Sequence, residues 1–129
     1  MPSSLISFLA VGLGAALGAW SRWGLSSWLN PKLTDFPLGT FVANAIGGLL
    51  VGFALAWLAA DATLSPAWRL FVITGFLGGL TTFSTYSAEV VGLLERGQVG
   101  AALGLALAHL VVSFALTALG LVLGRAVWN

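Results

Sequence analysis

Apolar runs separated by short polar breaks divide this chain into four segments. They cover residues 5–29, 38–60, 68–94 and 99–128. Each segment is longer than the roughly 20 residues that a helix needs to cross the hydrocarbon core of a bilayer. The breaks between them hold prolines, charged side chains and small polar residues, which are typical of loops. The pattern predicts one domain, residues 1–129, built of four transmembrane helices joined by short loops.

The amino-acid composition indicates which class of protein this pattern belongs to. The chain is 59% hydrophobic and only 7% charged, whereas a soluble domain is about 25% charged. Its net charge of +1 excludes a strongly basic nucleic-acid-binding protein. With no cysteine and one histidine, the chain has no disulfide, no thiolate catalysis and no multi-histidine metal site of its own. No nucleophile–base arrangement is visible, so we expect an all-α protein of the lipid bilayer and not an enzyme.

The cations of the loops carry almost no orientation signal. With the N-terminus inside the cell, Arg69 and Arg125 lie on the inner side, and Lys32 and Arg96 lie on the outer side. Membrane proteins normally concentrate Lys and Arg in their cytoplasmic loops. Either a small number of charges balances by chance, or the chain inserts both ways up. In the second case, two oppositely inserted copies could form an antiparallel dimer.

The first segment carries Gly14, Gly18 and Arg22 at a spacing of four, which places them on one helical face. Glycines at this spacing let membrane helices pack closely. Arg22 either snorkels to the membrane interface or supplies a fixed positive charge at the mouth of a polar cavity.

The second segment repeats this spacing with a different set of residues: Thr40, Asn44, Gly48 and Gly52. The amide of Asn44 lies well inside the apolar run and needs hydrogen-bond partners there, because lipid offers none. Asn44 therefore either holds two helices together or lines a permeation path.

The third segment holds the most unusual stretch, GFLGGLTTFSTYSAEV at residues 75–90. Behind the pair Gly78-Gly79, six of the seven residues 81–87 carry a hydroxyl group. This run predicts a helix that is broken in mid-membrane. Such breaks are tolerated where the freed backbone is buried in protein or faces water, and transporters place ion sites at them.

Other polar and aromatic positions leave two interpretations open. Phe83 and Tyr86 share a helical face, and they either pack against neighbours or present their positive ring edges to an anion. Glu89 is the carboxylate well inside a predicted span, near the end of the third segment. The fourth segment carries a polar stripe spaced by four: His109, Ser113 and Thr117. This stripe either bonds to a neighbouring helix or faces the same path as Asn44.

Together these faces offer amide, hydroxyl and ring-edge donors and almost no carboxylates. Cation pathways usually carry acidic rings, so this lining suits an anion. A proton-coupled pump would need a titratable relay, and a passive path is the simpler interpretation. Four helices are too few to enclose a pore and cover its lining, which implies an oligomer and most simply a dimer.

These motifs resemble the Fluc (CrcB) family of bacterial fluoride channels over essentially the whole chain. The matching stretches are Gly14-x-x-x-Gly18-x-x-x-Arg22, Gly39-Thr40 with Asn44 and Gly47-Gly48, and the run at residues 75–90. The resemblance implies a multi-pass protein of the bacterial inner membrane that forms an antiparallel, dual-topology homodimer with two pores at its interface. It also implies passive and highly selective export of fluoride, which lowers the cytoplasmic toxicity of this ion.

The resemblance implies roles for individual residues as well. Fluoride would contact Asn44 and two aromatic box positions, Phe83 and Tyr86, of which the second is usually phenylalanine. The other pore residues implied are Ser84, Thr85, Ser113, Thr40 and Glu89. Arg22 would lie at a vestibule. A structural sodium ion at the dimer interface would be held by the backbone carbonyls of two residues from each subunit: Gly78 and Thr81. Some members carry a pore-lining tyrosine on the fourth helix, and residues 99–128 have none.

Two other interpretations remain on the sequence alone. A small dual-topology exporter of cationic compounds would exchange them for protons at a carboxylate, usually in the first helix. The first segment has no such residue, and Glu89 lies late in the third. A non-transporting structural subunit would be held together by its small residues. In that case Asn44→Asp or Phe83→Ile would change stability without changing any flux.

Overall fold

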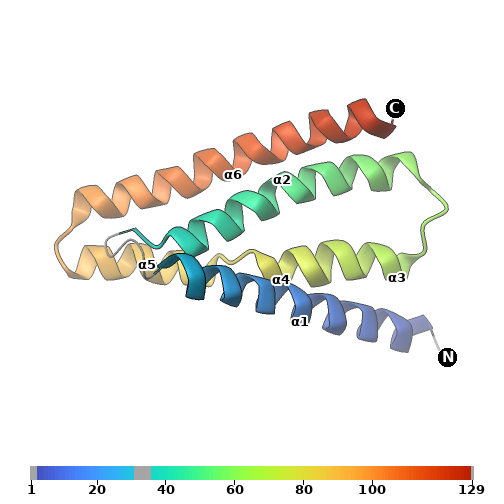
Figure 1. Cartoon of the computed structure of the whole chain (residues 1–129), viewed down its shortest axis with the longest axis horizontal. Coiled ribbons are helices and arrows are strands. Elements are labelled where there is room, and N and C mark those ends of the chain that lie inside the picture. Colours follow the sequence, from blue (N-terminus) through green and yellow to red (C-terminus); the bar gives the residue numbers. More distant parts are fainter. Residues whose placement is uncertain (1–2, 31–35, 129) are drawn as a thin grey trace.

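The computed structural model describes residues 3–30 and 36–128, and these residues form helices joined by short connections. Lys32, one of the loop cations counted above, lies outside the described residues. The helices are α1 (Ser3–Leu29), α2 (Leu38–Ala60), α3 (Pro66–Arg69), the π-helix η2 (Leu70–Leu77), α4 (Gly78–Leu80), α5 (Ser84–Glu95) and α6 (Val99–Trp128) (Figure 1).

The all-helical prediction is confirmed, with four helices long and apolar enough to cross a membrane. Three of these spans are α1, α2 and α6. The other runs over Pro66–Glu95 and consists of α3, η2, α4 and α5. We call it the third span, and we call residues 81–83, which lie between α4 and α5, the junction. Both ends of the chain lie at the same end of the molecule (Figure 1).

Local hydrogen bonds explain why the helices begin and end at the polar breaks. Ser65 caps the third span, since its side chain accepts a hydrogen bond from the Trp68 N–H, and Pro66 follows in the first turn, where its missing N–H is harmless. The Arg69 guanidinium donates to the carbonyls of Leu58 and Asp61, which closes the loop after α2. In the same loop, hydrogen bonds from Thr63 lower the pKa of the Asp61 carboxyl.

Two long seams of small residues hold the spans together. α2 packs mainly along α6, and α1 packs mainly on η2 and α4. At the first seam, a Cβ on Gly52 would collide with the backbone of Thr117, and one on Gly120 with the backbone of Leu49. At the second seam, Gly14 and Gly18 meet the backbone of the third span in the same way: Phe71, Gly75, Phe76, Gly79 and Leu80. The glycine face predicted for the first segment therefore brings two helix backbones into contact.

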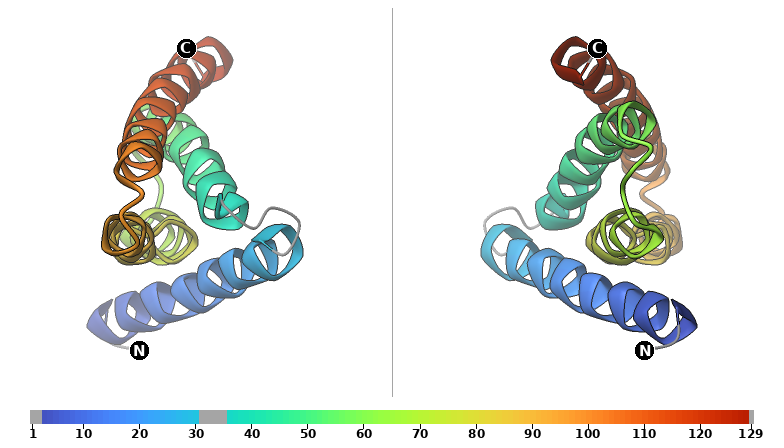
Figure 2. Two further views of the ribbon diagram at one scale, coloured as in Figure 1. Left: turned by 90° about the vertical axis from the view of Figure 1, so that its left-hand side faces the viewer. Right: turned by 90° about the vertical axis from the view of Figure 1, so that its right-hand side faces the viewer.

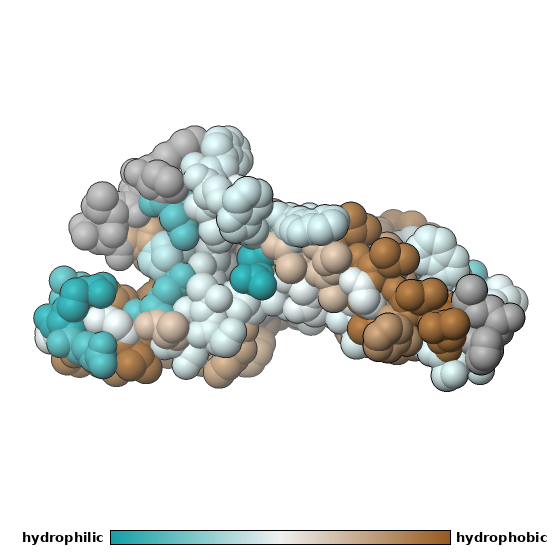
Figure 3. All heavy atoms as spheres, turned by 90° about the horizontal axis from the view of Figure 1, so that it is seen from below, coloured by the Kyte–Doolittle hydropathy of each residue, from teal (hydrophilic) through white to brown (hydrophobic). Residues whose placement is uncertain are grey.

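The third span lies at the centre of this arrangement. Seen end-on, α1 crosses one side of it, and α2 with α6 lies on the other side (Figure 2). The buried apolar core is small and includes Ala43 on α2 with Leu77 and Leu80 on the third span. Most of the remaining apolar surface faces outward, as a lipid-exposed surface requires; Phe8 and Leu13, for example, are 74% and 62% exposed. The face in Figure 3 is most hydrophobic toward the end that holds the chain termini and most hydrophilic at the opposite end.

Candidate ion-permeation site

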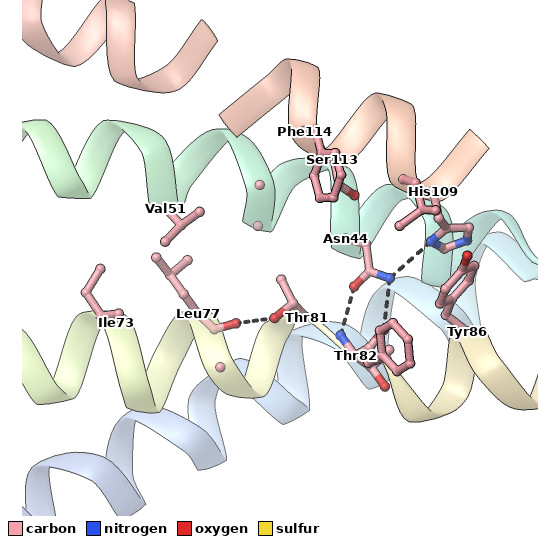
Figure 4. A pocket seen from close by; sticks show the side chains of 15 residues that line it. Asn44, Val51, Ile73, Leu77, Thr81, Thr82, Tyr86, His109, Ser113 and Phe114 are labelled. Atoms are coloured by element: carbon pink, nitrogen blue, oxygen red, sulfur yellow. Dashed lines mark hydrogen bonds between the residues drawn. The ribbon is translucent and has the colours of Figure 1, made fainter. Parts of the chain in front are cut away.

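A groove of about 480 Å³ opens where α2, the third span and α6 meet. Its walls are mostly apolar, with a few polar groups gathered around Asn44 (Figure 4). The lining residues are Asn44, Gly47, Gly48 and Val51 from α2; Ile73, Leu77, Gly78, Thr81, Thr82, Phe83 and Tyr86 from the third span; and His109, Leu110, Ser113 and Phe114 from α6. None of these described lining residues carries a carboxylate, which agrees with the donor-rich lining expected from the sequence.

Asn44 forms a two-bond pair with the backbone of the junction. The Thr82 N–H donates to the Asn44 Oδ1 at 2.8 Å, and the Asn44 Nδ2 donates to the Thr82 carbonyl at 3.0 Å. Its Nδ2 also lies 3.1 Å from the His109 Nδ1 on α6. Asn44 therefore joins three spans, as the first interpretation of the buried amide requires, and it also lines the groove (Figure 4), while its role on a permeation path stays a prediction.

At the junction, two backbone N–H groups donate to side-chain oxygens instead of to the carbonyls that they would bind in a continuous helix. In an α-helix each N–H donates to the carbonyl four residues earlier. The Thr82 N–H would therefore serve Gly78, but it donates to Asn44. The Thr85 N–H would serve Thr81, but it donates to the Thr82 Oγ1 at 3.1 Å. Thr81 itself has extended backbone, with φ −88° and ψ 156°. The carbonyls of Gly78 and Thr81 thus lose their α-helical donors beside the groove that both residues line.

Arg22 lies against α4, just before the junction, from the side of α1. Its Nε donates to the Gly79 carbonyl at 3.1 Å, and its side chain is half-buried. A cation at this place is favourable because the last carbonyls of a helix carry partial negative charge. The contact shows how Arg22 is held, and its vestibule role stays a prediction.

The two aromatic candidates lie together at the groove. The rings of Phe83 and Tyr86 meet edge to face, with centroids 5.5 Å apart and an interplanar angle of 76°. Phe83 is 74% exposed, whereas Tyr86 is 8% exposed. The Tyr86 hydroxyl donates to the Ala106 carbonyl on α6 at 2.9 Å. The hydroxyl that distinguishes this residue from the usual phenylalanine is therefore bound to α6.

Sequence reasoning missed two residues that bind Asn44 directly. Thr82 belongs to the hydroxyl-rich run, and His109 to the polar stripe of the fourth segment, yet neither was assigned to the site. His109 is 3% exposed. Its ring lies against Tyr86 with centroids 4.4 Å apart and meets the edge of Phe41 at 5.4 Å. The spacing of His109 with Ser113 was the available signal, since both residues line the groove.

Thr40 and Glu89 contact each other one helical turn away from the groove lining. The Thr40 hydroxyl donates to the Glu89 Oε1 at 2.6 Å, and Thr40 is 1% exposed. Glu89 therefore links α5 to α2. Its other oxygen is buried and has no hydrogen-bond partner among the described residues.

The remaining candidates lie at different distances from the groove. Ser113 lines it. Ser84, the first residue of α5, is exposed, and its hydroxyl lies 3.4 Å from that of Thr82. Thr85 follows in the first turn of α5 and makes the backbone bond described above. Ser84 and Thr85 are near the lining but not part of it.

Comparison with known proteins identifies the family. Residues 9–121 match the family described as CrcB-like protein, Camphor Resistance (CrcB). A protein of Thiobacillus denitrificans named fluoride-specific ion channel FluC is 58% identical over 116 residues, which cover 90% of this chain and 94% of that protein. The protein of the same name from Dechloromonas aromatica is 57% identical to this chain over 118 residues, which cover 92% of this chain and 87% of that protein. The protein of the same name from Pseudomonas putida is 54% identical over 117 residues, which cover 91% of this chain and 92% of that protein. The chain therefore belongs to the CrcB family, a family of membrane ion channels rather than enzymes.

Proposed function

We propose that this protein is a passive and highly selective fluoride channel. It exports fluoride across the bacterial inner membrane and so lowers the cytoplasmic toxicity of the ion. The proposal is supported by relatives that are named fluoride-specific channels. The observation that carries it in this chain is the groove, where the Asn44 amide lies among apolar walls and ring edges, with no carboxylate among the described lining residues.

The chemistry of the lining suits a small anion. An anion that leaves water must be met by donors, because an uncompensated buried charge is very costly. Asn44 supplies N–H groups, Ser113 supplies a hydroxyl, and Phe83 and Tyr86 supply ring edges with positive character. A cation would find few acceptors other than backbone carbonyls along the same walls.

The permeation path is completed by a second copy of the chain. In a single chain the groove is open, and Phe83 and Phe114 at its wall are 74% and 70% exposed. We propose an antiparallel, dual-topology homodimer whose interface covers both grooves and makes two pores. The nearly even distribution of loop cations is compatible with insertion in both orientations. In this dimer the junction is the mid-membrane break of the third helix.

A structural sodium ion fits two backbone carbonyls, that of Gly78 in α4 and that of Thr81 at the junction. Gly78 and Thr81 have lost their α-helical donors, and hard cations bind oxygen ligands of this kind. Two carbonyls from each subunit would hold the ion at the dimer interface. When bound, the ion would supply positive charge that balances the partial negative charge of the helix-end carbonyls.

An efflux assay tests the proposed function directly. Liposomes containing the purified protein are loaded with fluoride and chloride together, and valinomycin with potassium removes the voltage. We expect rapid loss of fluoride while chloride is retained, and no dependence on a proton gradient. Phe83→Ile should slow fluoride efflux. Thr117→Val is the matched control, because the Thr117 hydroxyl bonds the Ser113 carbonyl of its own helix.

The outcomes separate the interpretations left open by the sequence. Retention of both anions by a folded dimer would contradict the channel. Proton-dependent exchange of cations that is lost in Glu89→Gln would support the exporter instead. A structural subunit would be supported if neither the wild type nor any variant carried flux. In that case variants of Asn44 and Phe83 would change only the stability of the protein.

A further inference from the structure

The amide of Asn44 has one possible orientation in this structure. The Thr82 N–H can only donate, so the Asn44 atom at 2.8 Å from it must be the carbonyl oxygen. The Thr82 carbonyl can only accept, so the Asn44 atom at 3.0 Å from it must be the nitrogen. The junction backbone therefore fixes which end of the amide faces which partner.

This orientation determines the tautomer of His109. The Asn44 nitrogen has two hydrogens, of which one is donated to the Thr82 carbonyl. The other faces the His109 Nδ1 at 3.1 Å. The Nδ1 must therefore carry a lone pair, and the ring must be neutral with its proton on Nε2. An imidazolium would place two donors against each other at this contact.

Both hydrogens of the Asn44 amide are thus occupied within the protein. A permeating anion can receive one of them only in place of a present acceptor. The Thr82 carbonyl is part of the two-bond pair that holds the junction, so losing it would leave the broken backbone unpaired. The His109 nitrogen makes a single bond from another helix. Its ring is held by Tyr86 and Phe41 on two sides, and the amide stays paired with Thr82, so the N–H that faces His109 is the one that an anion can receive.

We propose that His109 is a positioning residue for the permeating anion, because its Nδ1 competes with the anion for one N–H of Asn44. A charged acceptor forms a bond roughly twice as strong as a neutral one, so fluoride, a strong acceptor, displaces the imidazole. Chloride is a larger and weaker acceptor, and it gains less from the same exchange. Either ion must break the same bond to His109, so the competition weakens anion binding at Asn44, as conduction requires, and does not by itself separate the two ions.

The ring is surrounded by few groups that could change its charge. On α5, Tyr86 has its hydroxyl bound to Ala106, and Glu89 lies one turn further with one oxygen bound to Thr40. On α2, Phe41 and Asn44 face the ring and neither ionises. The tautomer is therefore set by the Asn44 contact, and it is a property of the protein without any ion. The competition itself rests on the proposed fluoride permeation.

The chain's single histidine makes the tautomer directly measurable. In protein labelled with ¹⁵N-histidine and embedded in lipid, nuclear magnetic resonance should show one ring with protonated Nε2 and unprotonated Nδ1 at neutral pH. Fluoride should shift the Nδ1 signal, whereas equal chloride should not. In Asn44→Leu the Nδ1 signal should no longer respond to fluoride. In the control Thr117→Val it should respond as in the wild type.

Two substitutions of His109 separate competition from packing. His109→Phe keeps a ring between Tyr86 and Phe41 but removes the acceptor, whereas His109→Gln retains an acceptor oxygen. We expect His109→Phe to lower the fluoride concentration that gives half-maximal efflux by roughly three- to tenfold, because the anion no longer displaces a hydrogen bond. His109→Gln should stay closer to the wild-type value, and a structural role would not produce this difference.

The possible failures are distinguishable. A protonated Nδ1, or ring signals that ignore fluoride in a protein that conducts it, would overturn this inference alone. An unchanged half-maximal fluoride concentration in a folded His109→Phe channel would do the same. Absence of fluoride efflux from wild-type liposomes would overturn the proposed function, and the competition with it.

Discussion

The seams between the spans and the junction within the third span hold the molecule in opposite ways. At the seam of α2 with α6, glycines such as Gly52 and Gly120 remove side chains so that two backbones touch. At the junction and in α4 just before it, the side chains of Asn44 and Arg22 instead bind backbone groups that a continuous helix would satisfy. The seams set how the helices pack through backbone contacts at glycines, with almost no polar side chains involved. The junction gathers the polar groups of the groove and depends on hydrogen bonds that lipid cannot replace.

The largest effect is expected at the seam. Gly52→Leu places a branched side chain where a Cβ alone would collide with the backbone of Thr117. Overpacking a tight contact costs about 1–3 kcal/mol or more, and here the two helices must separate. We expect loss of the folded protein, and with it of the proposed dimer, measured by gel filtration and thermal unfolding in detergent.

Gly104→Leu is the matched control, because nothing lies within 4 Å of a Cβ at that position. It should unfold like the wild type. Equal damage by both variants would mean that helix propensity or lipid contact, and not the seam, explains the loss.

The next effect is expected at the junction. Asn44→Leu has nearly the same size but leaves the Thr82 N–H and carbonyl without their partner. Each unpaired buried group costs about 1–3 kcal/mol. We expect a lower thermal midpoint and loss of most fluoride efflux from liposomes. A variant that unfolds earlier but conducts as well as the wild type would show that Asn44 only holds the fold.

A smaller effect is expected for Arg22. Arg22→Gln removes a charged donor from the Gly79 carbonyl, and hydrogen bonds to charged groups contribute about 1.5–3 kcal/mol. Since Arg22 is only half-buried, water can replace part of this bond, and we expect a loss near the lower end. Arg22→Lys should restore part of the stability, as measured by thermal unfolding. Equal losses in both variants would indicate that the shape of the guanidinium matters and its charge does not.

The smallest effect is expected for Tyr86. Tyr86→Phe deletes the hydroxyl bound to the Ala106 carbonyl but keeps the ring. The net contribution of such a bond is about 1 kcal/mol. We expect slightly lower stability and an unchanged fluoride-to-chloride efflux ratio. A changed ratio would mean that the hydroxyl, and not only the ring edge, takes part in the site.

The sequence predicted the features that depend on one helix alone, namely where each span lies and which residues share a face. Apolar runs located the four spans, and the spacing of Gly14 and Gly18 predicted a close helix contact. The spacing of Thr40 and Asn44 with Gly48 and Gly52 suggested one shared polar face. In the structure the two glycines pack against α6, while Asn44 turns to the junction.

The hydrogen-bonded pairs between residues of different helices could not be predicted from the sequence. The bond of Asn44 to Thr82 spans 38 residues, and its contact with His109 spans 65. These distances depend on how the spans cross, which periodicity within one span does not specify. The π-helix η2 was also missed, because hydropathy gives no sign of the bonds to the fifth residue that widen a helix.

The pairing of Asn44 with Thr82 has a further consequence. One N–H and one carbonyl of the same residue are satisfied by one amide, which is the exchange between directly opposed residues in an antiparallel β-sheet. The Asn44 side chain thus makes the two hydrogen bonds that a residue of a neighbouring β-strand would make, although the protein is helical. An aspartate would lack the donor, a serine would be too short, and a glutamine would push α2 outward by one methylene. Asparagine is therefore the side chain that can join the backbone of Thr82 to α2 at this distance.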